Sequence, residues 1–496
     1  MAAGEGKSGS LEWKINVSNG TTKVLEPERG LAGRVWQKVQ SLIIMKAWKF
    51  LMDCWNIGVA EPTRFTHCLK VGLSLTVVSL LYYMRPLYDG IGKNAMWAIM
   101  TVVVVSEYTV GSTIYKSINR AVATTIAGSL GVGVHWVASH CDRVYQPIIL
   151  GVSVFIFASV ATFTRFIPTV KARFDYGAMI FILTFSLVSI SGYRVDELVM
   201  LAQQRVSTIA IGISLCILVS MLFWPVWAGD KLHNQTISNL EKLAISLEGY
   251  IAEYFSTEEA AQIPQEVLNK KLQGYKCVLN SKTTEESMAN LAIWEPAHGR
   301  FYFGYPWKQY LNIGAATRSC AYCIDNLNSC IDSKMQAPEL LKKHINDKCT
   351  RLSFYCSEVL RELATAIKTR KRSYNIDLSV DKMIFEVEEF QNALKSLPCE
   401  FVLPLSTPEN SIDKNGEKIE NPNQATLLEV LPLGMLATLL IEIVARVEEV
   451  VQEVDKLADM AEFKIQKEKK LQDIQPSENN QTKNQGQETM KAIEEV

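Results

Sequence analysis

The sequence has almost no net charge, because 51 Lys and Arg residues stand against 52 Asp and Glu residues and the formal net charge at pH 7 is -1. No stripe of basic residues of the kind that binds a phosphate backbone is present, so we predict no nucleic-acid partner. The first residues also lack an apolar run, which argues against a cleavable secretory signal. Insertion into a membrane would then be directed by the first membrane helix.

The sequence also lacks the residue sets that carry enzyme chemistry. Its 6 histidines show no paired spacing, and the close pair Cys320 and Cys323 has no second pair at zinc-ligand spacing. We interpret these cysteines as small buried residues. Gly128, Gly131 and Gly133 lie inside an apolar stretch with no strand before them, which excludes a dinucleotide fingerprint and favours close helix packing. We therefore predict no enzyme activity, no metal and no cofactor.

Apolar stretches dominate the region between Thr66 and Ala228. Roughly 20 apolar residues are needed to cross a bilayer core of about 30 Å. Four stretches contain no Asp, Glu, Lys or Arg at all: Ala121 to Ala138, Val144 to Thr164, Tyr176 to Tyr193 and Val206 to Gly229. Six spans are predicted, at Thr66 to Met84, Asn94 to Val110, Ile118 to Ala138, Gln146 to Phe163, Tyr176 to Ser191 and Val206 to Val226.

The rest of the chain is charged and shows helical periodicity, so the predicted fold class is an all-α membrane protein with six transmembrane helices followed by a cytosolic α-helical bundle domain. The predicted helices of that bundle are His233 to Tyr254, Pro264 to Leu279, Trp307 to Ser333, Pro338 to Lys368, Val380 to Leu397 and Gln424 to Phe463. The predicted organisation is a cytosolic N-terminal tail and amphipathic helix (1–60), a pore domain (61–229), a cytosolic helical domain (230–465) containing a linker (402–423), and a disordered tail (466–496).

Two segments allow alternative interpretations. Leu31 to Ile57 has one apolar face with lysines beside it, which fits either a helix on a membrane surface or a soluble helix packed on the second domain. Leu427 to Val444 is apolar enough for a seventh span. Because Glu429, Pro432 and Glu442 interrupt it, we favour a buried helix of the cytosolic bundle.

The distribution of Lys and Arg predicts that both termini are cytosolic, because cytoplasmic flanks of short loops carry an excess of these residues. Basic residues at membrane depth or at the ends of spans are Lys70, Arg120, Arg165, Lys171 and Arg173 on the inner side, and Arg85, Lys93, Arg194 and Arg205 on the outer side. Glu107 lies near the inner end of the second span, at the depth of Lys70. Three acids, Asp89, Asp196 and Glu197, accompany the outer basic residues as candidate cation contacts.

This pattern predicts an anion path, because Lys and Arg at both mouths attract anions and repel cations. Ionisable residues inside a membrane are costly and tend to line water-filled paths or to pair with each other. The alternative is that Lys70, Arg165 and Arg205 extend to the interface as topology anchors. Periodicity alone does not show that these residues face one another.

Several stretches make the chain similar to the plant aluminium-activated malate transporter family. Asn94 to Val105 reads NAMWAIMTVVVV and precedes Ser106, Glu107 and Tyr108, Phe174 to Phe185 reads FDYGAMIFILTF, and Pro225 to Gly229 reads PVWAG. Trp294, Glu295 and Pro296 match the WEP signature of the family. The resemblance covers roughly residues 55 to 465.

The resemblance implies a homodimeric anion channel that passes malate and inorganic anions such as chloride, nitrate and sulfate. Residues that match positions linked to conduction are Lys70, Glu107, Lys171, Arg194 and Arg205, and the charge pattern adds Arg120, Arg165 and Arg173. Glu295 matches the acid of the WEP signature, and the resemblance implies that this carboxylate is needed for activity. It could pair with Lys or Arg at the junction of the two domains, or it could cap a helix. The membrane favoured is the plasma membrane, with the tonoplast or another endomembrane as alternatives.

The loop between the fifth and sixth spans departs from the aluminium-responsive members. It has Asp196 and Glu197 followed by Leu198, Val199 and Met200, whereas a trivalent hard cation wants several carboxylate oxygens. The sequence therefore argues against direct activation by aluminium. Two other functions stay open, a proton-coupled carboxylate transporter that uses Glu107 and a membrane-anchored signalling or scaffold protein.

Overall fold

The computed structural model describes residues 31–84, 96–142, 144–191, 198–255, 273–331, 339–372, 374–396 and 427–465. Almost all of these residues are helical. The helices are α1 (Leu31–Ala60), α2 (Pro62–Tyr83), α4 (Met96–Val105), α5 (Val110–Ser139), α6 (Gln146–Thr164), α7 (Pro168–Ser191), α8 (Leu198–Leu222), α9 (Ala228–Phe255), α11 (Gly274–Leu279), α12 (Lys282–Ala292), α13 (Trp307–Ile331), α14 (Glu339–Thr369), α15 (Tyr374–Lys395) and α16 (Leu427–Met460). Two short parallel strands, β1 (Lys371–Arg372) and β2 (Lys464–Ile465), complete the described elements. The all-α class is confirmed.

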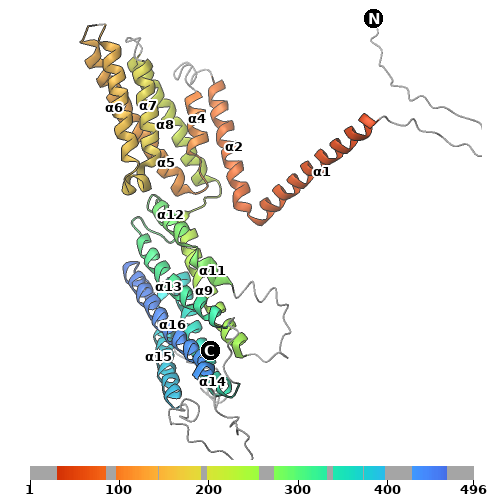
Figure 1. Ribbon diagram of the computed structural model, residues 1–496. Coiled ribbons are helices and arrows are strands. Elements are labelled where there is room, and N and C mark those ends of the chain that lie inside the picture. The colour runs from red at the N-terminus through yellow and green to blue at the C-terminus, as the bar shows by residue number, and fades with distance from the viewer. Residues whose placement is uncertain are drawn as a thin grey trace, which may run out of the picture.

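The apolar helices α2 and α4 to α8 pack together as one group, at the top of Figure 1. Five segments in the described residues are long and apolar enough to cross a membrane: Pro62–Leu81, Val110–Ser139, Gln146–Thr164, Pro168–Ile190 and Arg205–Leu222. The predicted second span is shorter than expected, since α4 covers only Met96–Val105. The prediction of a multi-pass membrane protein is confirmed. The second apolar helix, α4, is too short in the described residues to cross a membrane.

The boundary between α4 and α5 explains this difference. Ser106 to Thr109 is not helical, and Thr109 caps α5 by accepting a hydrogen bond from the Ser112 backbone N–H at 3.2 Å. The Ser112 hydroxyl accepts one in return from the Thr109 N–H, which completes a capping box. The prediction that the second helix runs to Val110 and contains Glu107 was therefore wrong. The third helix begins at Val110 and not at Ile118.

Helices α9 and α11 to α16 form a second group around one continuous apolar core, in the lower half of Figure 1. Leu433, Leu436 and Leu440 of α16 are buried in this core against α13, and Pro432 is accommodated inside the helix. The favoured interpretation of Leu427 to Val444 as a buried helix is confirmed. Cys320 and Cys323 are buried in the same core, as predicted. Helix α12 was not predicted, because its sequence has few apolar residues.

Helix α1 packs on α2 and extends away from both groups (Figure 1). Large apolar side chains along it, including Trp48, Leu51 and Trp55, are exposed. This arrangement leaves its apolar residues available to a membrane surface, which stays a prediction. The predicted linker (402–423), the predicted tail (466–496) and the outer residues Arg85 and Lys93 lie outside the described residues.

Candidate functional site

Three basic side chains are buried within the apolar helices. Lys70 of α2 is 6% exposed, Arg120 of α5 is 5% exposed and Arg205 of α8 is 9% exposed. Among the described residues, no carboxylate lies within ion-pair distance of any of them. Because a buried cation without a counter-ion is costly, these three residues are the strongest candidates for contact with an anion.

Arg205 lies beside a cavity and over an aromatic ring. Its guanidinium carbon is 4.5 Å from the centre of the Trp97 ring, and its buried Nε has no hydrogen-bond partner in the described part of the chain. The cavity has a volume of about 450 Å³. Seven of its lining residues have polar side chains, namely Thr124, Thr125, Ser129, Thr184, Gln203, Arg205 and Ser207, although apolar atoms make up most of the lining. The hydroxyls of Thr125, Ser129 and Ser207 donate to backbone carbonyls of their own helices, whereas the buried Thr124 hydroxyl has no partner among the described residues and can donate to an anion beside the Arg205 guanidinium.

Arg120 lies one helical turn before Thr124, which lines this cavity, on α5. Its Nη1 donates to the Tyr176 hydroxyl at 3.3 Å, and its Nε is buried without a partner among the described residues. Lys116 Nζ lies 5.6 Å from the centre of the Tyr176 ring. Tyr176 therefore connects two basic residues of α5 to α7.

Glu107 lies in the connection between α4 and α5 and not inside a transmembrane helix. Its Oε1 accepts a short hydrogen bond from Lys116 Nζ, and the Glu107 side chain is 35% exposed. The structure therefore places Glu107 near the end of the group that faces α9 and α12, in an ion pair.

Arg165 follows the end of α6 and forms a two-point ion pair with Asp175 of α7. Its Nε donates to Asp175 Oδ1 at 2.7 Å and its Nη2 donates to Oδ2 at 3.4 Å. Lys171 and Arg173 lie on the same end of α7 and are exposed, and Arg173 lines a cavity between α7 and the α12–α13 segment. The charge of Arg165 is thus partly balanced, unlike that of Arg205. Asp175 was missed by the sequence analysis.

The remaining outer candidates lie outside the described residues. They are Asp89, Arg194, Asp196 and Glu197. Their roles stay predictions.

The WEP segment forms the junction between the two helical groups. Glu295 is 4% exposed, and its carboxylate accepts three backbone hydrogen bonds. Oε1 accepts from the Gly111 N–H at 3.2 Å and from the Ala228 N–H at 2.6 Å, while Oε2 accepts from the Gly229 N–H at 3.0 Å. These donors belong to the first turns of α5 and α9. Of the two roles considered for Glu295, the structure shows helix capping, and it does so at two helices at once.

The residues around Glu295 complete a compact junction. The His298 ring stacks on Trp227 with 3.8 Å between ring centres, and His298 Nε2 is 4.0 Å from Glu295 Oε2. Trp294 makes an edge contact with Tyr115 of α5 at 5.8 Å. The Pro296 carbonyl oxygen is 2.8 Å from His298 Nδ1. The WEP loop therefore touches α5, the segment after α8, and the start of α9.

Burial and hydrogen bonding shift the pKa of the Glu295 carboxyl in opposite directions. Burial raises the pKa of its carboxyl above the ordinary value, and the hydrogen bonds from the Ala228, Gly229 and Gly111 backbones lower it. Three N–H donors directed at two oxygens fit an ionised carboxylate, which can accept all three. The positive ends of two helix dipoles favour the same form.

Sequence comparison places these residues in a known context. A family model described as Aluminium activated malate transporter matches residues 55–424 and 403–458. Aluminum-activated malate transporter 10 of Arabidopsis thaliana is 51% identical over 488 residues, which cover 94% of this chain and 97% of that protein. Aluminum-activated malate transporter 2 of the same plant is 43% identical over 413 residues, covering 83% and 78%. Aluminum-activated malate transporter 1 of Triticum aestivum is 40% identical over 422 residues, covering 82% and 84%. Lys70, Arg120, Arg205 and Glu295 all lie within the matched region.

Proposed function

We propose, from the premise that this chain belongs to the aluminium-activated malate transporter family, that it is an anion channel passing malate and inorganic anions across a plant membrane. The chain is a transporter and not an enzyme, because its family is one of transporters. The names of its relatives support malate as a transported substrate. Chloride, nitrate and sulfate are the inorganic anions we include.

The observation that carries this proposal is the burial of three cations that have no carboxylate partner among the described residues. Lys70, Arg120 and Arg205 come from α2, α5 and α8, and each is less than a tenth exposed. Removing an ion from water costs several kcal/mol even after the protein relaxes, and an anion at short range offsets part of that cost.

Passage of the anion would need no covalent chemistry. At the cavity beside Arg205, the unpartnered Arg205 Nε and Thr124 hydroxyl would replace part of the hydration shell of the anion, and the apolar helices around the cavity keep the path narrow. Lys171 and Arg173 add exposed positive charge at one end of α7 and raise the local anion concentration there. Flow would then follow the electrochemical gradient.

We extend the proposal to assembly and topology. A homodimer is proposed from the family resemblance, and both termini are placed in the cytosol from the distribution of Lys and Arg. The plasma membrane is the favoured location. We rank a proton-coupled transporter below a channel, because Glu107 is a partly exposed residue paired with Lys116 and not an acid in mid-membrane.

Voltage-clamp recording from cells that express the chain tests the proposal. The reversal potential should follow the malate gradient, and then the chloride or nitrate gradient when these anions replace malate. Arg205→Gln should lower the malate current at least about tenfold at equal surface expression, because tenfold corresponds to only about 1.4 kcal/mol and a buried charge contributes more than that at short range.

Arg64→Gln is the matched control, since Arg64 is an exposed Arg at the start of α2 that pairs with Glu61. It should leave the current within about twofold of wild type, in line with the small value of surface ion pairs. Surface-expressed protein that passes no anion current, or an Arg205→Gln variant that conducts like wild type, would contradict the proposal.

A further inference from the structure

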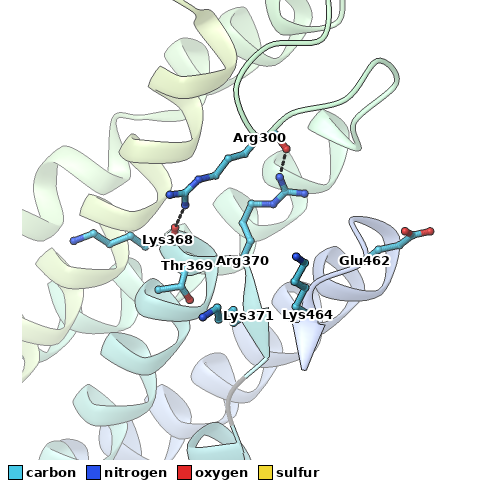
Figure 2. Close-up of a pocket in the computed structure, with 7 residues that line it drawn as sticks. All are labelled: Arg300, Lys368, Thr369, Arg370, Lys371, Glu462 and Lys464. Atoms are coloured by element: carbon cyan, nitrogen blue, oxygen red, sulfur yellow. Dashed lines mark hydrogen bonds between the residues drawn. The ribbon is translucent and has the colours of Figure 1, made fainter. Parts of the chain in front are cut away.

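A second concentration of positive charge lies in the other helical group, far along the chain from the buried cations. We call it the basic pocket, and its volume is about 690 Å³. The residues that line it are Arg300, Lys368, Thr369, Arg370, Lys371, Glu462 and Lys464, shown in Figure 2. They come from the WEP loop, the end of α14, β1 and the segment after α16. Five of the seven are basic and one is acidic.

The positive charge of the basic pocket is not balanced within the described residues. Lys371 and Lys464 are directly opposite each other in the parallel β1–β2 pair, and like charges in that position are destabilising. Across the described chain, Arg300, Lys368, Lys371 and Lys464 have no carboxylate within 4.0 Å. The next residue, Arg372, pairs with Asp455 at 3.3 Å. In Figure 2 the Glu462 carboxylate points away from the lysines.

Arg370 connects segments of the basic pocket through hydrogen bonds to backbone carbonyls. Its Nη1 donates to the Arg300 carbonyl oxygen, its Nη2 donates to the Ala461 carbonyl oxygen at 3.4 Å, and its guanidinium lies 5.0 Å from the centre of the Tyr305 ring. Arg300 in turn donates through Nη1 to the Lys368 carbonyl oxygen at 3.4 Å. Three separate segments are therefore held next to one another at the basic pocket.

Helix ends alone do not account for this cluster. The C-terminus of α14 favours a nearby cation such as Lys368 through the helix dipole. Arg300 lies in a loop, and Lys371 and Lys464 lie in strands beyond the helix ends. The excess of cations at one place therefore points to a ligand with several negative charges.

We propose that the basic pocket binds a phosphate-bearing anion that carries at least three negative charges. Arg and Lys give charge-assisted hydrogen bonds to phosphate oxygens, and these are roughly twice as strong as neutral ones. The volume falls within the range of about 300–1,000 Å³ found for ligand pockets. A singly charged anion would leave most of the cations unbalanced.

Two sources could supply this chemistry, a soluble polyphosphate or the headgroup of a membrane lipid. The lipid is within reach because His298, two residues before Arg300, stacks on Trp227 just beyond the end of α8. Clusters of Lys and Arg close to a membrane attract anionic headgroups. The inference goes beyond the proposed channel activity, and its test measures binding without any current.

Binding of fluorescently labelled tripolyphosphate to the purified full-length protein in detergent is the test. Lys371→Gln together with Lys464→Gln should weaken binding at least about tenfold. The matched control, Lys282→Gln together with Lys343→Gln, removes two exposed lysines elsewhere and should bind like wild type. Both double variants change only exposed side chains, and equal melting temperatures would show that both are folded. Equal tripolyphosphate binding by the two double variants would overturn the proposal.

A second arm identifies the source. The wild-type protein and both double variants are placed in nanodiscs of phosphatidylcholine, with or without a phosphatidylinositol bisphosphate, and the tripolyphosphate titration is repeated. Weaker binding in the presence of the phosphoinositide, seen for wild type and the control but not for the pocket variant, assigns the site to a lipid headgroup. Unchanged tripolyphosphate binding assigns it to a soluble polyphosphate.

Discussion

Replacing Glu295 is the perturbation whose effect follows most directly from the structure. This single carboxylate satisfies backbone donors from the first turn of α5 and the first turn of α9, and Gly111 is 184 residues away from it in the chain. Glu295→Ala removes every acceptor at once. Glu295→Gln keeps the shape of the side chain and one carbonyl oxygen.

The two variants should lose different amounts of unfolding free energy, because they leave different numbers of backbone N–H groups without an acceptor. In Glu295→Ala three buried N–H groups lose their partner, and an unsatisfied buried donor costs about 1–3 kcal/mol, so a loss of about 3–9 kcal/mol is expected. In Glu295→Gln the carbonyl oxygen can take the place of Oε1 and keep the bonds from Gly111 and Ala228. The amide then faces the Gly229 N–H, one bond is lost, and a cost of about 1–3 kcal/mol is expected.

Thermal unfolding of the full-length protein in detergent, followed by tryptophan fluorescence, provides the measurement. Trp227, Trp294 and Trp307 lie near Glu295 and report on the junction. Glu286→Ala on α12 is the control, because Glu286 is exposed and should leave the melting temperature unchanged. The reasoning is refuted if Glu295→Ala melts like wild type, or if Glu295→Gln is as destabilised as Glu295→Ala.

Two further predictions concern titration and charge pairing. Burial, with smaller contributions from Arg370 and Arg300, lowers the pKa of His233 from 6.5 to about 4, so the unfolded state binds this proton first and stability should fall by up to about 3 kcal/mol as pH drops through that window. His233→Gln should reduce that loss, as measured by melting temperature between pH 7 and pH 4, and an unchanged pH profile would contradict the assignment. Asp175→Asn should remove the ion pair of Arg165 and raise the malate current. Pairs of this kind are worth about 0.2–1 kcal/mol, so the expected increase in current is about 1.4- to 5-fold. Adding Arg165→Gln to Asp175→Asn should cancel that increase in voltage-clamp recordings, and equal currents in wild type and Asp175→Asn would exclude the effect.

Most helices of the membrane group could be predicted because apolar stretches in lipid must form closed hydrogen-bonded structures. The prediction for α6 differs from the structure by one residue, at its C-terminal end. The start of α7 was placed too late, because Lys171, Arg173 and Asp175 end the apolar run while the helix itself begins at Pro168. Apolarity marks the part of a helix that lipid can surround, and the backbone helix continues beyond it.

The site was predicted less completely, because pairing depends on contacts between distant segments. The sequence identified Lys70, Arg120 and Arg205 as ionisable residues at membrane depth, and the structure shows that they are buried. It did not indicate that Asp175 balances Arg165, although an acid in the FDYG stretch is itself a signal of pairing. The position of Glu295 between two helix starts depends on contacts across more than 60 residues, which no local pattern records.

The junction suggests how the two helical groups act on each other. Helix α5 carries Arg120 and packs on both α9 and α12, and its first turn is fixed by Glu295. The same loop continues through His298 to Arg300 in the basic pocket. An anion that draws Arg300 toward Lys371 and Lys464 would therefore pull on a loop that already holds the start of α5. Because a Cβ added at Gly229 would lie 2.5 Å from the Trp307 ring, this junction has little free space, and a movement of the loop must be shared by α5 and α9.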